Sequence, residues 1–167
     1  MSDTRPVNVL ILCTGNSARS IVGEALFNHL GKGRIRAFSA GSKPSGTVNP
    51  VALETLEKHG IPLPAEARSK SWDEFAAPGA PRLDYIFTVC ASAAGEACPI
   101  WPGHPTTAHW GIDDPAHIEP MEARRAAFEV AFTALEKRIK AFLALDLESM
   151  SRADVITAAR LIHEACQ

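Results

Sequence analysis

Short apolar runs bounded by turn residues alternate along the chain with segments in which apolar residues recur every three or four positions. The short runs predict buried strands at residues 7–12, 34–41, 83–90 and 106–111. The three- and four-residue spacing is typical of the buried face of an amphipathic helix. It predicts helices over residues 20–30 and 51–59, and a long helix from residue 120 onwards.

Residues that start and stop helices support these boundaries. Asn49 is a good N-cap before Pro50 at the first helical position, and Gly60 suits the end of that helix. The Ser-x-x-Glu pattern at residues 71–74 predicts a short helix, and the Ser-x-x-Asp pattern at residues 151–154 opens a terminal one.

A chain of 167 residues is about the size of one ordinary domain. Strands that alternate with helices favour an α/β fold. We therefore predict a single domain over residues 6–145, with a four-stranded parallel sheet flanked by helices, and a C-terminal helical tail over residues 146–167. Ligands of such folds bind beyond the carboxyl ends of the strands, where both Cys13 and Cys90 are expected to lie.

The formal net charge is −2, so the charge count does not indicate nucleic acid or an anionic membrane as a partner. Residues 1–6 are polar, and the apolar run after them is too short for a signal peptide or a membrane span. We expect a cytoplasmic protein, in which structural disulfides are rare. The cysteines are then functional thiols, metal ligands or packing residues: Cys13, Cys90, Cys98 and Cys166.

The stretch CTGNSARS, residues 13–20, connects the first predicted strand to its helix. Such a loop turns successive backbone N–H groups inward and binds an anion at the helix N-terminus. The same positive field lowers the pKa of Cys13, by about 1–5 units from about 8.5, and makes it a thiolate. Arg19 adds a planar set of donors that fits two oxygens of a tetrahedral anion. Gly15 and Asn16 tolerate the left-handed backbone that a tight loop requires.

CTGNSARS resembles the Cys-x5-Arg-Ser loop shared by low-molecular-weight protein tyrosine phosphatases and by the arsenate reductases built on the same fold. The likeness extends to SAGS at residues 39–42, and it covers the chain from about Val7 to about Phe142. It implies that Asn16 orders the loop and that Cys13 is a nucleophile, rather than a small buried residue. The oxyanion is then bound by the rest of the loop: Thr14, Gly15, Asn16, Ser17, Ala18, Arg19 and Ser20.

Both groups of enzymes need an acid that protonates the leaving oxygen. Asp114 directly precedes Pro115, as in the general-acid loop of the family, and Asp113 is the neighbouring alternative. The tyrosine phosphatases usually carry aromatic residues after this Asp-Pro pair, whereas this chain has Ala116 and His117. In this region the chain resembles the arsenate reductases more closely.

Arsenate reduction needs a second thiol, which attacks the sulfur of the nucleophile and expels arsenite. The resemblance assigns this attack to Cys90, and it gives Cys98 the role of forming a Cys90–Cys98 disulfide that carries the oxidation to the surface. An external thiol reductant then restores the enzyme, either thioredoxin or glutaredoxin with glutathione. Cys166 in place of Cys98 is an open alternative. Zinc binding is disfavoured, because the spacing of the cysteines is not that of a zinc site.

Some arsenate reductases of this type hold a potassium ion beside the loop, through residues that match Asn16, Glu24 and Ser39 and through an acidic residue of a later segment. In this chain Ser71 takes the acidic position, and Lys70 lies beside it. An ammonium group at this place can supply the charge of the cation. We therefore predict no bound metal and no bound cofactor.

The resemblance implies an arsenate reductase that serves arsenic detoxification, with phosphate and sulfate as competing oxyanions. A phosphatase that acts on phosphotyrosine or on small phosphate esters is the alternative enzyme, since the same loop suffices for it. A non-catalytic oxyanion or redox sensor is the alternative outside the enzymes. Turnover, as opposed to one stoichiometric oxidation, distinguishes the sensor from both.

Overall fold

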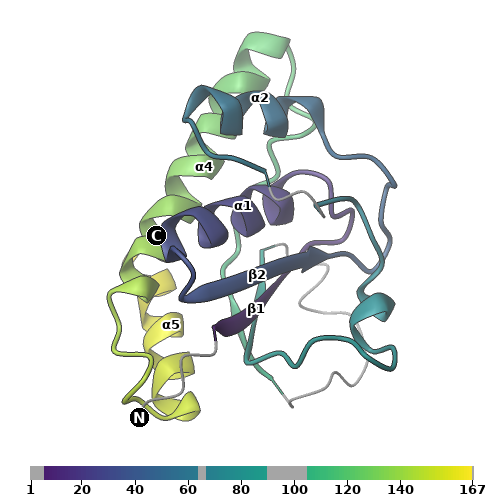
Figure 1. The fold of residues 1–167 in the computed structure, drawn as a ribbon. Coiled ribbons are helices and arrows are strands. Elements are labelled where there is room, and N and C mark those ends of the chain that lie inside the picture. The colour runs from purple at the N-terminus through teal and green to yellow at the C-terminus, as the bar shows by residue number, and fades with distance from the viewer. Residues whose placement is uncertain (1–5, 64–66, 90–104, 167) are drawn as a thin grey trace.

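The computed structural model describes residues 6–63, 67–89 and 105–166, whose elements Figure 1 shows. The strands are β1 (Val7–Leu12), β2 (Ile35–Ala40), β3 (Tyr85–Thr88) and β4 (Thr106–His109). The helices are α1 (Arg19–Gly31), α2 (Pro50–Lys58), α4 (Met121–Leu143) and α5 (Arg152–Cys166), with a 3₁₀ helix η1 (Trp72–Phe75).

The four strands form one parallel sheet in the order β2-β1-β3-β4. This confirms the predicted α/β fold with a four-stranded parallel sheet. Because the strands are parallel, their carboxyl ends meet at one edge: Leu12 is level with Thr88, and Thr88 is level with His109. The connections after β1, β3 and β4 therefore all begin at the edge where the predicted site lies.

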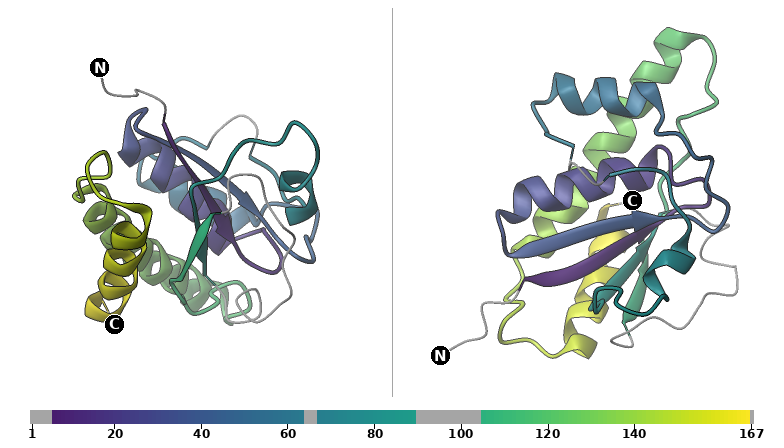
Figure 2. Two further views of the ribbon diagram at one scale, coloured as in Figure 1. Left: turned by 90° about the horizontal axis from the view of Figure 1, so that it is seen from below. Right: turned by 45° about the vertical axis from the view of Figure 1, so that its right-hand side comes forward.

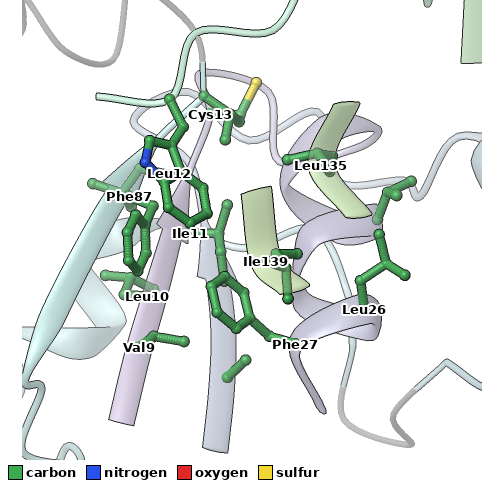
Figure 3. Close-up of a cluster of buried hydrophobic side chains, with 14 of the residues drawn as sticks. Val9, Leu10, Ile11, Leu12, Cys13, Leu26, Phe27, Phe87, Leu135 and Ile139 are labelled. Carbon is green, nitrogen blue, oxygen red and sulfur yellow. The ribbon is translucent and has the colours of Figure 1, made fainter. Parts of the chain in front are cut away.

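The core is an apolar layer between the sheet and two helices. α1 and α4 pack against each other, and α2 packs on α4 (Figure 2). Phe27 of α1, Phe87 of β3 and Phe142 of α4 surround Trp110, and the Phe87 and Trp110 ring centroids are 4.2 Å apart. Figure 3 shows this layer, with Cys13 beyond the end of the β1 side chains. Cys13 thus directly follows a strand whose last four residues are buried.

The predicted helix starts are present with their caps. The Asn49 side chain accepts a hydrogen bond from Val51 N at 2.8 Å, and Ser151 Oγ accepts one from Asp154 N at 3.1 Å. Ser71 Oγ likewise accepts from Asp73 N, but only a four-residue 3₁₀ helix follows. Among the described residues, no helix has the length and apolar character needed to cross a membrane.

The tail helix α5 lies along the β4 edge of the sheet and beside α4 (Figure 2). Trp110 Nε1 donates to the Ala159 carbonyl at 2.9 Å, and Arg160 Nη2 donates to the Thr107 carbonyl at 2.9 Å. Val155, Ile156 and Ala159 are buried in the core. The tail thus packs on the domain and covers an edge strand, whose open backbone would otherwise pair with other chains.

Candidate active site

The loop after β1 is fixed from outside by its carbonyl groups. The carbonyl of Thr14 accepts from Lys43 N, that of Gly15 from Ser45 N, and that of Ser17 from Asn49 N, all at 2.8–3.0 Å. In a trans peptide the N–H of the next residue points the opposite way. The N–H groups that follow these three carbonyls, those of residues 15, 16 and 18, therefore point away from the outer segment. This orientation is what an inward-facing anion site requires.

Asn16 ties the loop to two other segments. It is buried and has a left-handed backbone, with a φ of 45°. Its Nδ2 donates to Ser20 Oγ at 2.8 Å, and its Oδ1 accepts from Lys70 N at 2.9 Å. These contacts agree with the loop-ordering role expected of Asn16. The left-handed backbone expected at Gly15 as well is wrong, because Asn16 alone makes the reversal in this loop.

The surroundings of Gly41 explain why the SAGS segment has a glycine at this position. A Cβ atom at this position would lie 2.3 Å from the Thr14 carbonyl oxygen and 2.6 Å from that of Cys13, closer than any side chain tolerates. Gly41 also accepts from Trp72 N and donates to the Lys70 carbonyl, both at 2.9 Å. Glycine is therefore required here, because the backbone of this segment approaches the loop carbonyls closely. The sequence match located the glycine but did not explain it.

Arg19 is the first residue of α1, and its guanidinium joins the loop to the segment after β4. Its Nη1 donates to the Ile112 carbonyl at 2.8 Å, and its Nη2 lies 3.6 Å from Asp114 Oδ2. Its Nε is buried and has no hydrogen-bond partner among the described residues. Part of the guanidinium thus remains available to an anion.

The predicted acid loop lies at the same edge of the sheet. Backbone bonds from Trp110 N to the Thr88 carbonyl and from Ile112 N to the Val89 carbonyl continue the β3–β4 pairing into this loop. The structure brings Asp114 to Arg19, and Asp114 Oδ1 accepts from Ala116 N in a tight turn. Asp114 is 41% exposed, so it is accessible to a ligand bound at Arg19.

A polar cluster lies behind the loop and is separate from its anion side. Ser39 Oγ donates to the buried carboxylate of Glu24. Lys70 is also buried, and its Nζ donates to the Arg68 carbonyl at 2.7 Å. Burial lowers the pKa of Lys70, and the nearby Glu24 carboxylate opposes this shift. Lys70 thus brings a positive charge near the buried Glu24 carboxylate.

The structure describes two of the four cysteines. Cys13 is buried directly after β1, and Cys166 is partly exposed at the end of α5. Cys90 and Cys98 lie outside the described residues. Residue type does not reveal the Ile112 carbonyl as a partner of Arg19, because every residue has a backbone carbonyl.

Residues 8–154 match the family model described as low molecular weight phosphotyrosine protein phosphatase. The chain belongs to this family. An arsenate reductase of Bacillus licheniformis is 36% identical over 136 residues, which are 80% of this chain and 93% of that protein. The family thus contains reductases as well as phosphatases.

Solved structures of relatives have the same fold. A crystal structure of an arsenate reductase from Archaeoglobus fulgidus has a TM-score of 0.62 and 28% identity, over 82% of this chain and 99% of that one. A thioredoxin-dependent arsenate reductase from Corynebacterium glutamicum has a TM-score of 0.54 and 25% identity, over 81% of this chain and 63% of that one.

We predict that Gly41→Ala greatly weakens oxyanion binding. The added methyl group would meet two backbone carbonyls of the loop, so the loop must shift. Isothermal titration of the purified protein with phosphate should show an affinity at least about tenfold lower, which corresponds to about 1.4 kcal/mol.

Ser42→Ala is the matched control for this variant. It changes the next residue and removes a buried hydroxyl that has no hydrogen-bond partner in the described part of the chain. Its phosphate affinity should equal that of the unaltered protein. Normal phosphate binding by a folded Gly41→Ala variant would contradict the proposed close approach.

Proposed function

We propose that this protein reduces arsenate to arsenite, with Cys13 as the nucleophile. The observation that carries the proposal is the meeting of Cys13, Arg19 and Asp114 at one edge of the sheet, beside a loop whose N–H groups face away from its outer supports. The names of the relatives favour arsenate over a phosphate ester as the substrate.

In the first step arsenate binds in the loop as a tetrahedral anion. The N–H groups of residues 15, 16 and 18 and the Arg19 guanidinium donate to its oxygens, and phosphate and sulfate compete because they have the same shape. The Cys13 thiolate then attacks arsenic and forms an S–As(V) bond. Asp114 gives its proton to the oxygen that leaves as water. Ser20 Oγ accepts a hydrogen bond from Asn16, so its hydroxyl hydrogen can donate to the Cys13 thiolate.

The second step moves two electrons. The Cys90 thiolate attacks the Cys13 sulfur, the S–As bond breaks, and its electron pair stays on arsenic, which leaves as arsenite. Cys13 and Cys90 are then joined by a disulfide. The Cys98 thiolate attacks Cys90, which releases Cys13 as a thiolate and leaves a Cys90–Cys98 disulfide. These two assignments come from the family resemblance.

An external thiol reductant completes the cycle by reducing the Cys90–Cys98 disulfide. Thioredoxin is the first candidate, because the Corynebacterium glutamicum relative is described as thioredoxin-dependent. Glutaredoxin with glutathione is the alternative. Such a cycle needs a reducing thiol pool, which is the reason to place the enzyme in the cytoplasm, where it would detoxify arsenic.

The family match favours phosphate-ester hydrolysis as the second candidate function. The same loop, Arg19 and Asp114 suffice for it. Ala116 and His117 follow the Asp-Pro pair and offer no aromatic wall for a phosphotyrosine ring. Weak hydrolysis of small esters is compatible with a reductase, since phosphate and arsenate bind alike.

We predict that the fully reduced protein releases one arsenite per chain from one equivalent of arsenate, without external thiol. Cys13→Ser and Cys90→Ser should release none, because each removes a thiol that the electron transfer requires. Cys98→Ser should release one arsenite and stop as the Cys13–Cys90 disulfide. Arsenite measurement and mass mapping of the disulfides check these outcomes.

Cys166→Ser is the control in this series and should behave like the unaltered protein, ending as Cys90–Cys98. In the unaltered protein, a disulfide that contains Cys166 would instead make Cys166 the resolving thiol. No arsenite together with rapid hydrolysis of a phosphate ester would overturn the reductase proposal in favour of a phosphatase. One oxidation that no thiol system reverses would favour a sensor.

We predict that Asp114→Asn slows arsenite formation by about 10²–10⁴-fold, the usual contribution of a general acid. The amide keeps the shape of the side chain and lacks the proton to donate. Asp113→Asn is the matched control and should change the rate little. Single-turnover kinetics measure both, and the reverse order of effects would assign the acid to Asp113.

A further inference from the structure

The two halves of α5 are attached to the domain in different ways. The first half buries Val155, Ile156 and Ala159 in the core. In the second half Leu161 is 57% exposed and Ile162 is partly buried against the core, while the hydrogen bonds to the domain come from polar side chains. Arg160 donates to the Thr107 carbonyl, and His163 contacts α4 and β4. The last two turns of α5 thus contact α4 through a titratable side chain.

His163 is held in one protonation state by an arginine. The Nε of Arg138, a residue of α4 that is 4% exposed, donates to His163 Nδ1 at 3.0 Å, and its Nη1 donates to the Ala134 carbonyl at 2.9 Å. Arginine is always charged and has no acceptor. The bond therefore forms only while His163 Nδ1 carries no proton.

The surroundings of His163 on balance increase this preference. The ring of His109, on β4, is 6.2 Å from the His163 ring, and its Nδ1 is 2.8 Å from Thr88 Oγ1. Burial lowers the pKa of His163, and Arg138 and His109 lower it further, while Glu164 on α5 itself acts in the opposite direction. The charge of Arg138 also interacts with Cys166, the last residue of the helix.

We propose that His163 is an acid-sensitive latch, whose protonation breaks the Arg138 hydrogen bond and releases the last two turns of α5 while the sheet stays folded. A proton on Nδ1 would place two donors and two positive charges against each other at the hydrogen-bond distance. The apolar first half of α5 and the ion pair of Arg152 with Asp84, at 2.7 Å, keep the helix attached at its start.

The sign of the pH effect follows from the two pKa values. In the released state His163 regains a pKa near the ordinary value of about 6.5, and in the docked state the pKa is lower. Docking is therefore strongest above about pH 6.5. As the pH falls below this value, the equilibrium constant for release rises about tenfold per unit until the docked-state pKa is reached.

Hydrogen–deuterium exchange of the full chain, followed by mass spectrometry from pH 5 to 8, tests the latch. After correction for the intrinsic pH dependence of exchange, peptides covering residues 160–166 should lose protection below about pH 6.5. Peptides of β1 and α1 should keep theirs, which separates local release from acid unfolding of the whole protein.

Two variants separate the latch from general acid effects. His163→Asn keeps an acceptor oxygen, Oδ1, at the position of Nδ1 and cannot titrate, so residues 160–166 should stay protected at all these pH values. His109→Gln is the matched control and should keep the acid-induced loss. In the unaltered protein, protection of residues 160–166 that does not depend on pH would overturn the proposal, and so would an equal acid-induced loss in His163→Asn.

Discussion

The close contact of Gly41 with the carbonyl groups of Cys13 and Thr14 is the constraint on which the rest of the site depends. It brings the segment after β2 against the loop after β1, where the backbone N–H groups of Lys43, Ser45 and Asn49 donate to the loop carbonyls. The loop N–H groups then face the other way, toward the place of an anion. A loop held this way needs no reorganisation when it binds its ligand, which is the arrangement that stabilises developing charge most effectively.

The parallel sheet brings the segment after β4, which contains Ile112 and Asp114, next to the loop after β1. The ends of β1 and β3 are adjacent, and the segment after β4 continues that pairing to Ile112, whose carbonyl binds Arg19. Arg19 and Asp114, the proposed anion-binding arginine and the proposed acid, are therefore positioned by backbone bonds of the same sheet edge. Lys70 lies beside the loop: its backbone N–H donates to Asn16 Oδ1, and its buried side chain interacts with the buried Glu24 carboxylate.

Periodicity and capping residues predicted the strands, the helices and the end of the sheet at which the site lies, because these features depend on local residue patterns. Asn16 and Asp114 were found through a family motif. Two features depend on contacts between segments far apart in the chain, and residue type alone does not reveal them. They are the need for a glycine at position 41 and the hydrogen bond from Arg19 to the Ile112 carbonyl. The same is true of the contacts of Lys70, a residue next to Ser71, which the family resemblance placed at the acidic position. It is also true of the contact between Arg138 and His163 in the tail.

We propose that this loop stabilises the thiolate form of Cys13 and binds a tetrahedral oxyanion directly over it. The most direct measurement is the rate of iodoacetamide modification of Cys13 against pH, followed by mass spectrometry with and without arsenate, and compared with the same cysteine in the urea-unfolded chain. We predict a half-maximal rate well below the ordinary thiol value of about pH 8.5 and strong protection by arsenate. A pH profile identical to that of the unfolded chain, with no protection by arsenate, would contradict the claim.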